Sequence, residues 1–96
     1  MKFHLHPQAE TELDDAISYY DNCEFGLGLE FAEEIYSAIG RICEYPDSSQ
    51  RISKNTRRCL VNRFPYGVVF QVKSKAIRII AVANLHKRPN YWGKRI

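Results

Sequence analysis

The residues of this chain best suited to chemistry lie in its second half, where basic and aromatic side chains are interleaved. Arginine binds a phosphate group through two parallel hydrogen bonds, and a tyrosine or tryptophan ring can stack on a base or anchor an interface. The pattern predicts contact with a target or its phosphate groups through nine residues: Arg57, Arg58, Arg63, Arg78, Lys87, Arg88, Tyr91, Trp92 and Arg95. For Tyr91 and Trp92 the alternative is a structural role, in which the rings dock the tail on the core.

Cleavage of RNA is the reaction that this set of side chains could catalyse without a metal. A general base takes the proton of the 2′-hydroxyl group, arginines stabilise the charged phosphorane, and an acid protonates the leaving oxygen. If the chain is a nuclease, the candidates for these roles are Arg63, His86, Arg88 and Tyr91.

Patterns for metal binding, nucleophilic catalysis and phosphate loops are weak or missing. His4 and His6 point the same way from a short strand, but no third ligand of a suitable type is nearby. The chain has no G-x-S-x-G motif, and its five glycines are too scattered for a phosphate loop. We therefore expect no metal site and no cofactor, and we expect the three cysteines to be reduced thiols.

Charge is divided between the two halves of the chain. Residues 1–48 hold all 11 acidic residues and two basic ones, for a net charge of −9, whereas residues 49–96 hold 12 basic residues and no acid, for +12. This asymmetry predicts a polyanionic target or an acidic partner. The alternative is that the two halves neutralise each other across the fold.

The composition is that of a folded domain. Of the 96 residues, 45% are hydrophobic and 26% are charged, which argues against a fibrous or disordered chain. No apolar run approaches the roughly 20 residues of a membrane span, and the N-terminus lacks the apolar stretch of a signal peptide. These observations predict a single cytoplasmic domain over residues 1–96 with no membrane partner.

Hydrophobic periodicity predicts two helices that follow a short strand. Residues 2–6 alternate as in a strand, and Pro7 suits the first position of a helix. Gly26–Gly28 separates this helix from a second one, which Pro46 ends, so the two form an antiparallel hairpin. The early acidic residues of the first helix are expected mostly opposite its apolar stripe: Glu10, Glu12, Asp14 and Asp15.

The rest of the chain is predicted to be a sheet. Residues 47–56 are expected to form a loop, and residues 57–63, 66–72 and 76–85 to be strands of an antiparallel meander. The fold class is therefore α+β, with the helical hairpin on one sheet face. The predicted core between them comprises Phe3, Leu5, Leu13, Ile17, Phe31, Ile35, Ile39, Ile42, Val69, Ile79 and Ala81, and one face of the last strand comprises Ile77, Ile79, Ala81, Ala83 and Leu85.

Several segments in a fixed order carry a resemblance to a known family. They are Ala9-x-x-x-Leu13 with Ile17 and Tyr20, Gly26-Leu27-Gly28-x-x-Phe31, Pro46, Arg58-x-Leu60-Val61-x-Arg63-Phe64-Pro65-Tyr66, Val68-Val69-Phe70, Ile79-Ile80-Ala81-Val82-Ala83, and Arg88-Pro89-x-Tyr91-Trp92-x-x-Arg95. With these the chain resembles, over nearly its full length, the RelE/ParE superfamily of toxins from bacterial type II toxin–antitoxin modules. The resemblance implies the same strand–helix–helix–meander fold.

The resemblance also implies one of two activities. RelE-like members are ribosome-dependent endonucleases that cut mRNA in the A site without metal, whereas ParE-like members poison DNA gyrase by binding. A RelE-type enzyme typically has an arginine directly after the tyrosine that opens the third strand, and here that position is Gly67. The sequence therefore favours a ParE-like toxin that inhibits a DNA-handling target such as DNA gyrase. The alternatives are an mRNA endonuclease that acts on the ribosome and a toxin-derived binding module without toxicity.

The resemblance further implies a cognate antitoxin that neutralises the toxin in a toxin–antitoxin hetero-oligomer. From the charge division we expect this antitoxin to supply an acidic and apolar segment, which folds over the basic sheet face or the hairpin groove.

Overall fold

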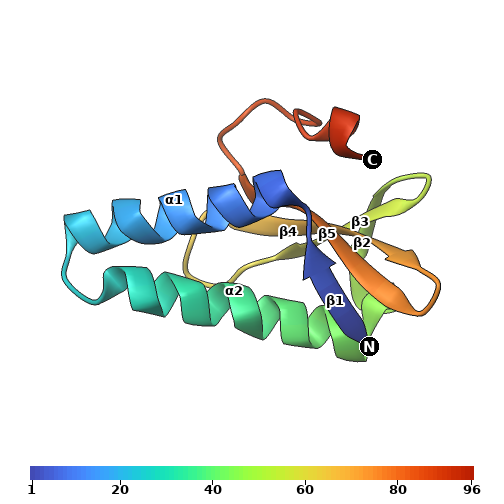
Figure 1. The fold of residues 1–96 in the computed structure, drawn as a ribbon, viewed down its shortest axis with the longest axis horizontal. Helices are drawn as coiled ribbons and strands as arrows, with labels where there is room; N and C mark the ends of the chain where they lie inside the picture. The colour runs from blue at the N-terminus through green and yellow to red at the C-terminus, as the bar shows by residue number, and fades with distance from the viewer.

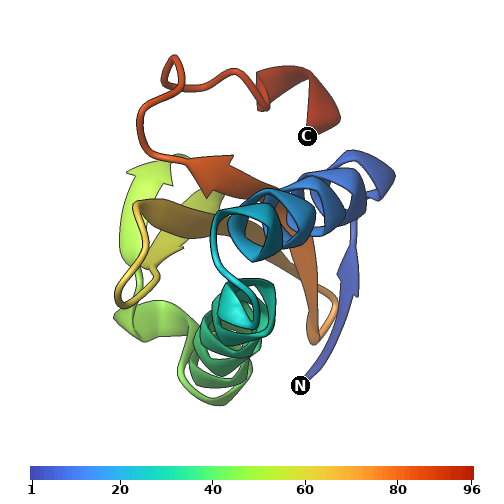
Figure 2. The same ribbon diagram turned by 90° about the vertical axis from the view of Figure 1, so that its left-hand side faces the viewer.

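The computed structural model describes all residues 1–96, and its elements follow the predicted order closely. They are β1 (Lys2–Leu5), α1 (Pro7–Cys23), α2 (Leu27–Glu44), β2 (Gln50–Ser53), β3 (Thr56–Leu60), β4 (Tyr66–Lys73) and β5 (Ala76–Asn84), with short 3-10 turns at Pro46–Ser48 and Gly93–Arg95. The two helices cover one face of the sheet (Figure 1), and the C-terminal segment, residues 85–96, crosses the other face (Figure 2). None of the helices is long and apolar enough to cross a membrane.

The two helices approach each other closely where α2 begins. Gly26 has a φ of 85°, a conformation that favours glycine, and a Cβ on Gly28 would stand 2.5 Å from the carbonyl oxygen of Ile17. Asp21 Oδ1 accepts hydrogen bonds from the backbone N–H groups of Gly26 and Gly28, at 3.0 and 3.2 Å. An acid of α1 thus satisfies donors at the start of α2, which fixes the hairpin.

The sheet has the strand order β1-β5-β4-β3-β2. β1 pairs with β5 in parallel, and the remaining pairs are antiparallel, so the meander carries one parallel edge strand. The prediction of a loop over residues 47–56 is wrong, because Gln50–Ser53 forms β2 at the opposite edge. This segment is polar and mostly exposed, so it has no alternating pattern, and it becomes a strand by pairing with β3.

A β-bulge changes which side chains of β5 face the helices. Val69 pairs with Ala81, but Phe70 pairs with Ile79, so Ile80 is an extra residue in the ladder. The predicted single face of β5 is therefore wrong. Ile77 and Ile79 face the helices, whereas Ala81 and Ala83 face the C-terminal segment.

The sheet separates two cores, and the bulge decides which residues of β5 belong to each. The main core, between helices and sheet, includes the predicted Leu13, Phe31, Ile35, Ile39, Ile42 and Ile79, with Leu5 and Ile17 packed at its edge. Phe3 is 41% exposed on the edge strand, so its predicted burial is wrong. Val69 and Ala81 are buried as predicted, but they lie in a second core on the other sheet face with Ile80, Ala83 and Trp92.

Candidate functional site

The C-terminal segment is held on the sheet by a buried tryptophan. Trp92 is only 6% exposed and packs in the second core with the apolar residues of β4 and β5. Its ring therefore docks the segment on the protein, and it is not free to stack on a base.

A single carboxylate fastens the same segment to α1. Glu12 accepts hydrogen bonds from the Tyr91 hydroxyl at 2.6 Å and from both terminal nitrogens of Arg95 at 2.8 and 3.0 Å. It also accepts one from the backbone N–H of Val82 in β5, at 3.1 Å. Glu12 thus joins α1, the sheet and the C-terminal segment, and it is an exception among the four early acids of α1, most of which were expected opposite the apolar stripe. We call this arrangement the Glu12 clasp.

The clasp changes the acid–base properties of its members. Burial, together with the hydrogen bond to Glu12 and its charge, raises the pKa of the Tyr91 hydroxyl well above the usual range. The hydrogen bond to Glu12 raises the pKa of Arg95. The cations of Lys87 and Arg95 lie over the Tyr91 ring, 5.3 and 5.2 Å from its centroid. Tyr91 therefore stays protonated and is poorly suited to act as a general base.

Beside the clasp lies a hollow of about 420 Å³, which we call the C-terminal cleft. It is bounded by the end of β2, the outer face of β3–β5 and residues 84–92, and no acidic residue lines it. Ile52, Leu85 and Pro89 supply accessible apolar surface, and Arg58, Lys87 and Arg88 supply three positive charges. This combination suits an anionic group that is attached to an apolar one.

Gly67 leaves room for the stem of Arg58 in this cleft. A Cβ on Gly67 would stand 2.9 Å from Cδ and 3.0 Å from Cγ of Arg58, so a larger residue at position 67 would displace the arginine stem. The Nε atom of Arg58 is buried and has no hydrogen-bond partner, and its Nη2 lies 3.5 Å from Gln50 Oε1. Arg58 therefore keeps donors that no residue of the chain satisfies well.

Three other predicted arginines are engaged outside the cleft. Arg57 donates to the backbone carbonyls of Asp47 and Ser49 and lies 3.7 Å from the Asp47 carboxylate. Arg63 forms an ion pair with Glu30 at 2.7 Å. Arg78 donates to the Arg95 carbonyl at 2.8 Å, which helps hold the C-terminal segment.

The four nuclease candidates do not converge on one hollow. Arg88 lines the C-terminal cleft, whereas His86 lines a separate hollow between α1 and the C-terminal segment. Tyr91 borders both hollows, and Arg63 borders neither. The arrangement can bind an anion, but it does not place an acid and a base around one phosphate site.

Comparison with known proteins identifies the family. The model for the ParE toxin of the type II toxin–antitoxin system parDE matches residues 3–89. The chain belongs to the ParE toxin family. It is also similar in fold to the solved structure of the chromosomal ParDE TA system from P. aeruginosa, with a TM-score of 0.78, 18% sequence identity, and coverage of 90% of this chain and 97% of that chain. No curated protein matches the chain.

The family match separates two parts of the site. Within the ParE range lie the three cations of the C-terminal cleft, including Arg88. Tyr91, Trp92 and Arg95 lie beyond the matched residues, so the clasp joins this terminal segment to Glu12 inside the ParE region. The segment Arg88-Pro89-x-Tyr91-Trp92 could be noticed in the sequence, but nothing local to it pointed to Glu12.

Proposed function

We propose that residues 1–96 form a toxin domain that inhibits a DNA-handling enzyme such as DNA gyrase by binding it, and that a cognate antitoxin neutralises it. The observation that carries this proposal is the C-terminal cleft, in which three cations border apolar surface and no acidic residue is present. Such a surface favours binding to an anionic and partly apolar region of another macromolecule.

The separation of the nuclease candidates supports binding over catalysis. Metal-free RNA cleavage needs an acid, a base and a charged donor around one phosphate. Here the Tyr91 hydroxyl donates to Glu12, Arg63 pairs with Glu30, and His86 and Arg88 border different hollows. Gly67 has no side chain to contribute a charged donor, and the stem of Arg58 occupies the space beside it.

The same cleft suits the antitoxin partner. The P. aeruginosa structure with the same fold is described as a ParDE TA system, which supports a partner of the ParD type for this chain. An acidic and apolar segment of that partner would place its carboxylates beside Arg58 and Arg88 and its apolar side chains against Ile52 and Leu85. The affinity of the antitoxin segment for the cleft should fall as salt is added, because part of this affinity comes from exposed charges.

The test of the target is a pair of assays on one protein preparation: DNA gyrase supercoiling, and single-turnover mRNA cleavage on ribosomes with a programmed A site. We expect inhibition of supercoiling and little or no cleavage. Arg88→Ala should weaken the inhibition, because it removes one of several contacts, and Lys94→Ala is the control with an equal change of charge outside the cleft.

Two other outcomes would contradict the proposal. Rapid A-site cleavage that Tyr91→Phe abolishes, with supercoiling unaffected, would identify an mRNA endonuclease, because only the hydroxyl oxygen is removed. Inactivity in both assays would indicate another target or a binding module without toxicity.

A further inference from the structure

Two β-hairpin tips form the end of the molecule opposite the connection between the helices (Figure 1). One tip is the turn of Lys54 and Asn55 between β2 and β3, and the other is the turn of Ser74 and Lys75 between β4 and β5. Ser74 and Lys75 both have positive φ, at 49° and 64°, as in a tight two-residue hairpin turn. Lys54 and Lys75 therefore stand at the tips of short turns, and Lys73 ends β4.

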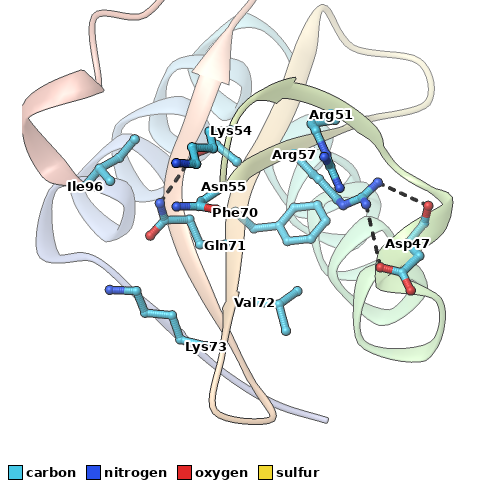
Figure 3. A pocket seen from close by; sticks show the side chains of 11 residues that line it. Asp47, Arg51, Lys54, Asn55, Arg57, Phe70, Gln71, Val72, Lys73 and Ile96 are labelled. Atoms are coloured by element: carbon cyan, nitrogen blue, oxygen red, sulfur yellow. Dashed lines mark hydrogen bonds and ion pairs between the residues drawn. The ribbon is translucent and has the colours of Figure 1, made fainter.

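A hollow of about 410 Å³ lies beside these tips, and we call the tips and this hollow together the hairpin-tip surface (Figure 3). Arg51, Lys54 and Lys73 line the hollow, are exposed and form no ion pair, and Lys75 stands exposed and unpaired on the neighbouring tip. Asp47 is the one acid in the lining, and Figure 3 shows Arg57 turned toward it, away from Lys54 and Lys73. The surface therefore carries an excess of positive charge.

The lining of the hollow suits phosphate groups better than a peptide. Asn55, Thr56 and Gln71 add polar groups to the cations. Of the three apolar residues in the lining, Phe70 is fully buried, and Val72 and Ile96 are exposed. A docked peptide would need a cluster of apolar anchors, and this hollow offers two separate exposed apolar residues, whereas Ile52, Leu85, Pro89 and Tyr91 lie together in the lining of the C-terminal cleft. Phosphates need only charges and hydrogen-bond donors.

The lining also favours a duplex over a single strand. Proteins that bind single-stranded nucleic acid combine positive charge with aromatic rings on which bases stack. No tyrosine or tryptophan lines this hollow, and the Phe70 ring is not accessible. Recognition here would use the backbone alone, which a duplex displays on its outside.

Acidic residues at the helix connection, which is the end opposite the hairpin tips, would orient an approaching polyanion. Asp21 and Glu24 are exposed near the helix connection, at the far end of a molecule 39 Å long. The field of such a charge distribution repels a polyanion from the helix connection and attracts it to the hairpin tips.

We propose that the hairpin-tip surface binds the sugar–phosphate backbone of duplex DNA, with Lys54 and Lys73 each contacting a phosphate. This contact is separate from the C-terminal cleft and from the proposed protein target. It would let the toxin contact an enzyme and the DNA held by that enzyme at the same time.

The salt dependence of DNA binding gives the expected size of the effect. Each phosphate contact contributes about −0.9 to the slope of log K against log salt concentration. Lys54→Gln and Lys73→Gln should each reduce the slope by about 0.9, and the double variant by about 1.8. Near 0.1 M salt, each lost contact should weaken binding on the order of tenfold.

The experiment measures fluorescence anisotropy of a labelled DNA duplex of about 20 base pairs with the full chain, over roughly 50 to 200 mM salt. Lys94→Gln is the matched control, because Lys94 is an exposed lysine on the C-terminal segment outside the hollow. We expect the two hairpin-tip variants to lose affinity and slope and the control to keep both. Circular dichroism checks that every variant remains folded.

Three results would overturn the proposal. The first is the absence of duplex binding at the lowest salt concentration. The second is an equal loss in Lys94→Gln, which would mean that net charge alone attracts the DNA. The third is tighter binding of an RNA duplex or of polyglutamate than of DNA. Gyrase inhibition by the same variants, measured separately, tests the proposed function, so the two proposals can fail independently.

Discussion

Replacing Glu12 with glutamine should release the C-terminal segment from the helices. The glutamine keeps the size and helix propensity of the residue but removes the charge that Arg95 requires, and its amide nitrogen cannot accept a hydrogen bond. The ion pair is nearly buried, with 11% of the Arg95 side chain and 16% of the Glu12 side chain exposed. Breaking a fully buried pair costs about 3–5 kcal/mol, so this residual exposure places the expected loss at about 2–4 kcal/mol.

The assay uses two probes of unfolding. Trp92 is the only tryptophan in the chain and is the residue of the C-terminal segment that is buried against the sheet, so its fluorescence and its quenching by acrylamide report the docking of that segment. Far-UV circular dichroism reports the helices. A loss of 2–4 kcal/mol should lower the melting temperature by on the order of 10–30 °C, and Trp92 should become more accessible before the helices melt.

The control for this experiment is Glu10→Gln, which removes an exposed acid of the same helix that makes no ion pair. It should change stability by less than about 0.5 kcal/mol. If Glu12→Gln unfolds like this control and Trp92 stays protected from acrylamide, the clasp does not hold the segment and the reasoning is refuted.

Two further predictions concern the helix contact and alkaline pH. Gly28→Ala should destabilise the protein by about 1–3 kcal/mol, because the new Cβ would meet the Ile17 carbonyl oxygen. Its control is Gly40→Ala, which has open space around it and should stabilise the protein by about 0.5–1 kcal/mol. Urea unfolding midpoints measure both changes, and similar shifts for the two variants would contradict the close packing at Gly28. Because the folded state raises the pKa of Tyr91, its contribution to stability is intact below pH ~10 and is lost as pH rises further, by about 1.4 kcal/mol per pH unit. Denaturation at pH 9 and 11 should show a weaker pH dependence for Tyr91→Phe, and an unchanged dependence would exclude this cause.

The elements with a strong period were predictable from the sequence. The apolar stripe of α2 and the proline that follows it predicted the second helix. The residues Lys73–Lys75 predicted the hairpin between β4 and β5. β2 was missed because an exposed polar edge strand has no alternation to detect. The bulge opposite Val69 and Phe70 was missed because β5 is apolar on both faces, so a change of face leaves the pattern unaltered.

For the candidate site, the residue types were predictable but their partners were not. The sequence identified the basic residues of the second half, and the structure gathers Arg58, Lys87 and Arg88 around one cleft. Arg63 forms an ion pair with Glu30, which is 33 positions away in the sequence, and no local pattern predicts this contact. The docking of Trp92 could not be located from the sequence, because Trp92 packs on Ile80, Ala81 and Ala83, and the bulge that sets which residues of β5 form this face was not predicted.

Glu12 had a detectable signal after all, and that signal connects the charge division to the fold. Position 12 lies three residues after Ala9 and four before Ala16, which are both buried, so an acid there faces inward and requires a cation. Because 12 of the 14 basic residues lie in the second half, the pattern favours a partner from there without identifying which one. Each of the three ion pairs joins an acid of the first half to an arginine of the second. These pairs leave eight acidic and eleven basic residues without an ion-pair partner, so mutual neutralisation accounts for only part of the charge division. A partner of this toxin would therefore bind to the residues without an ion-pair partner, and not to the three ion pairs.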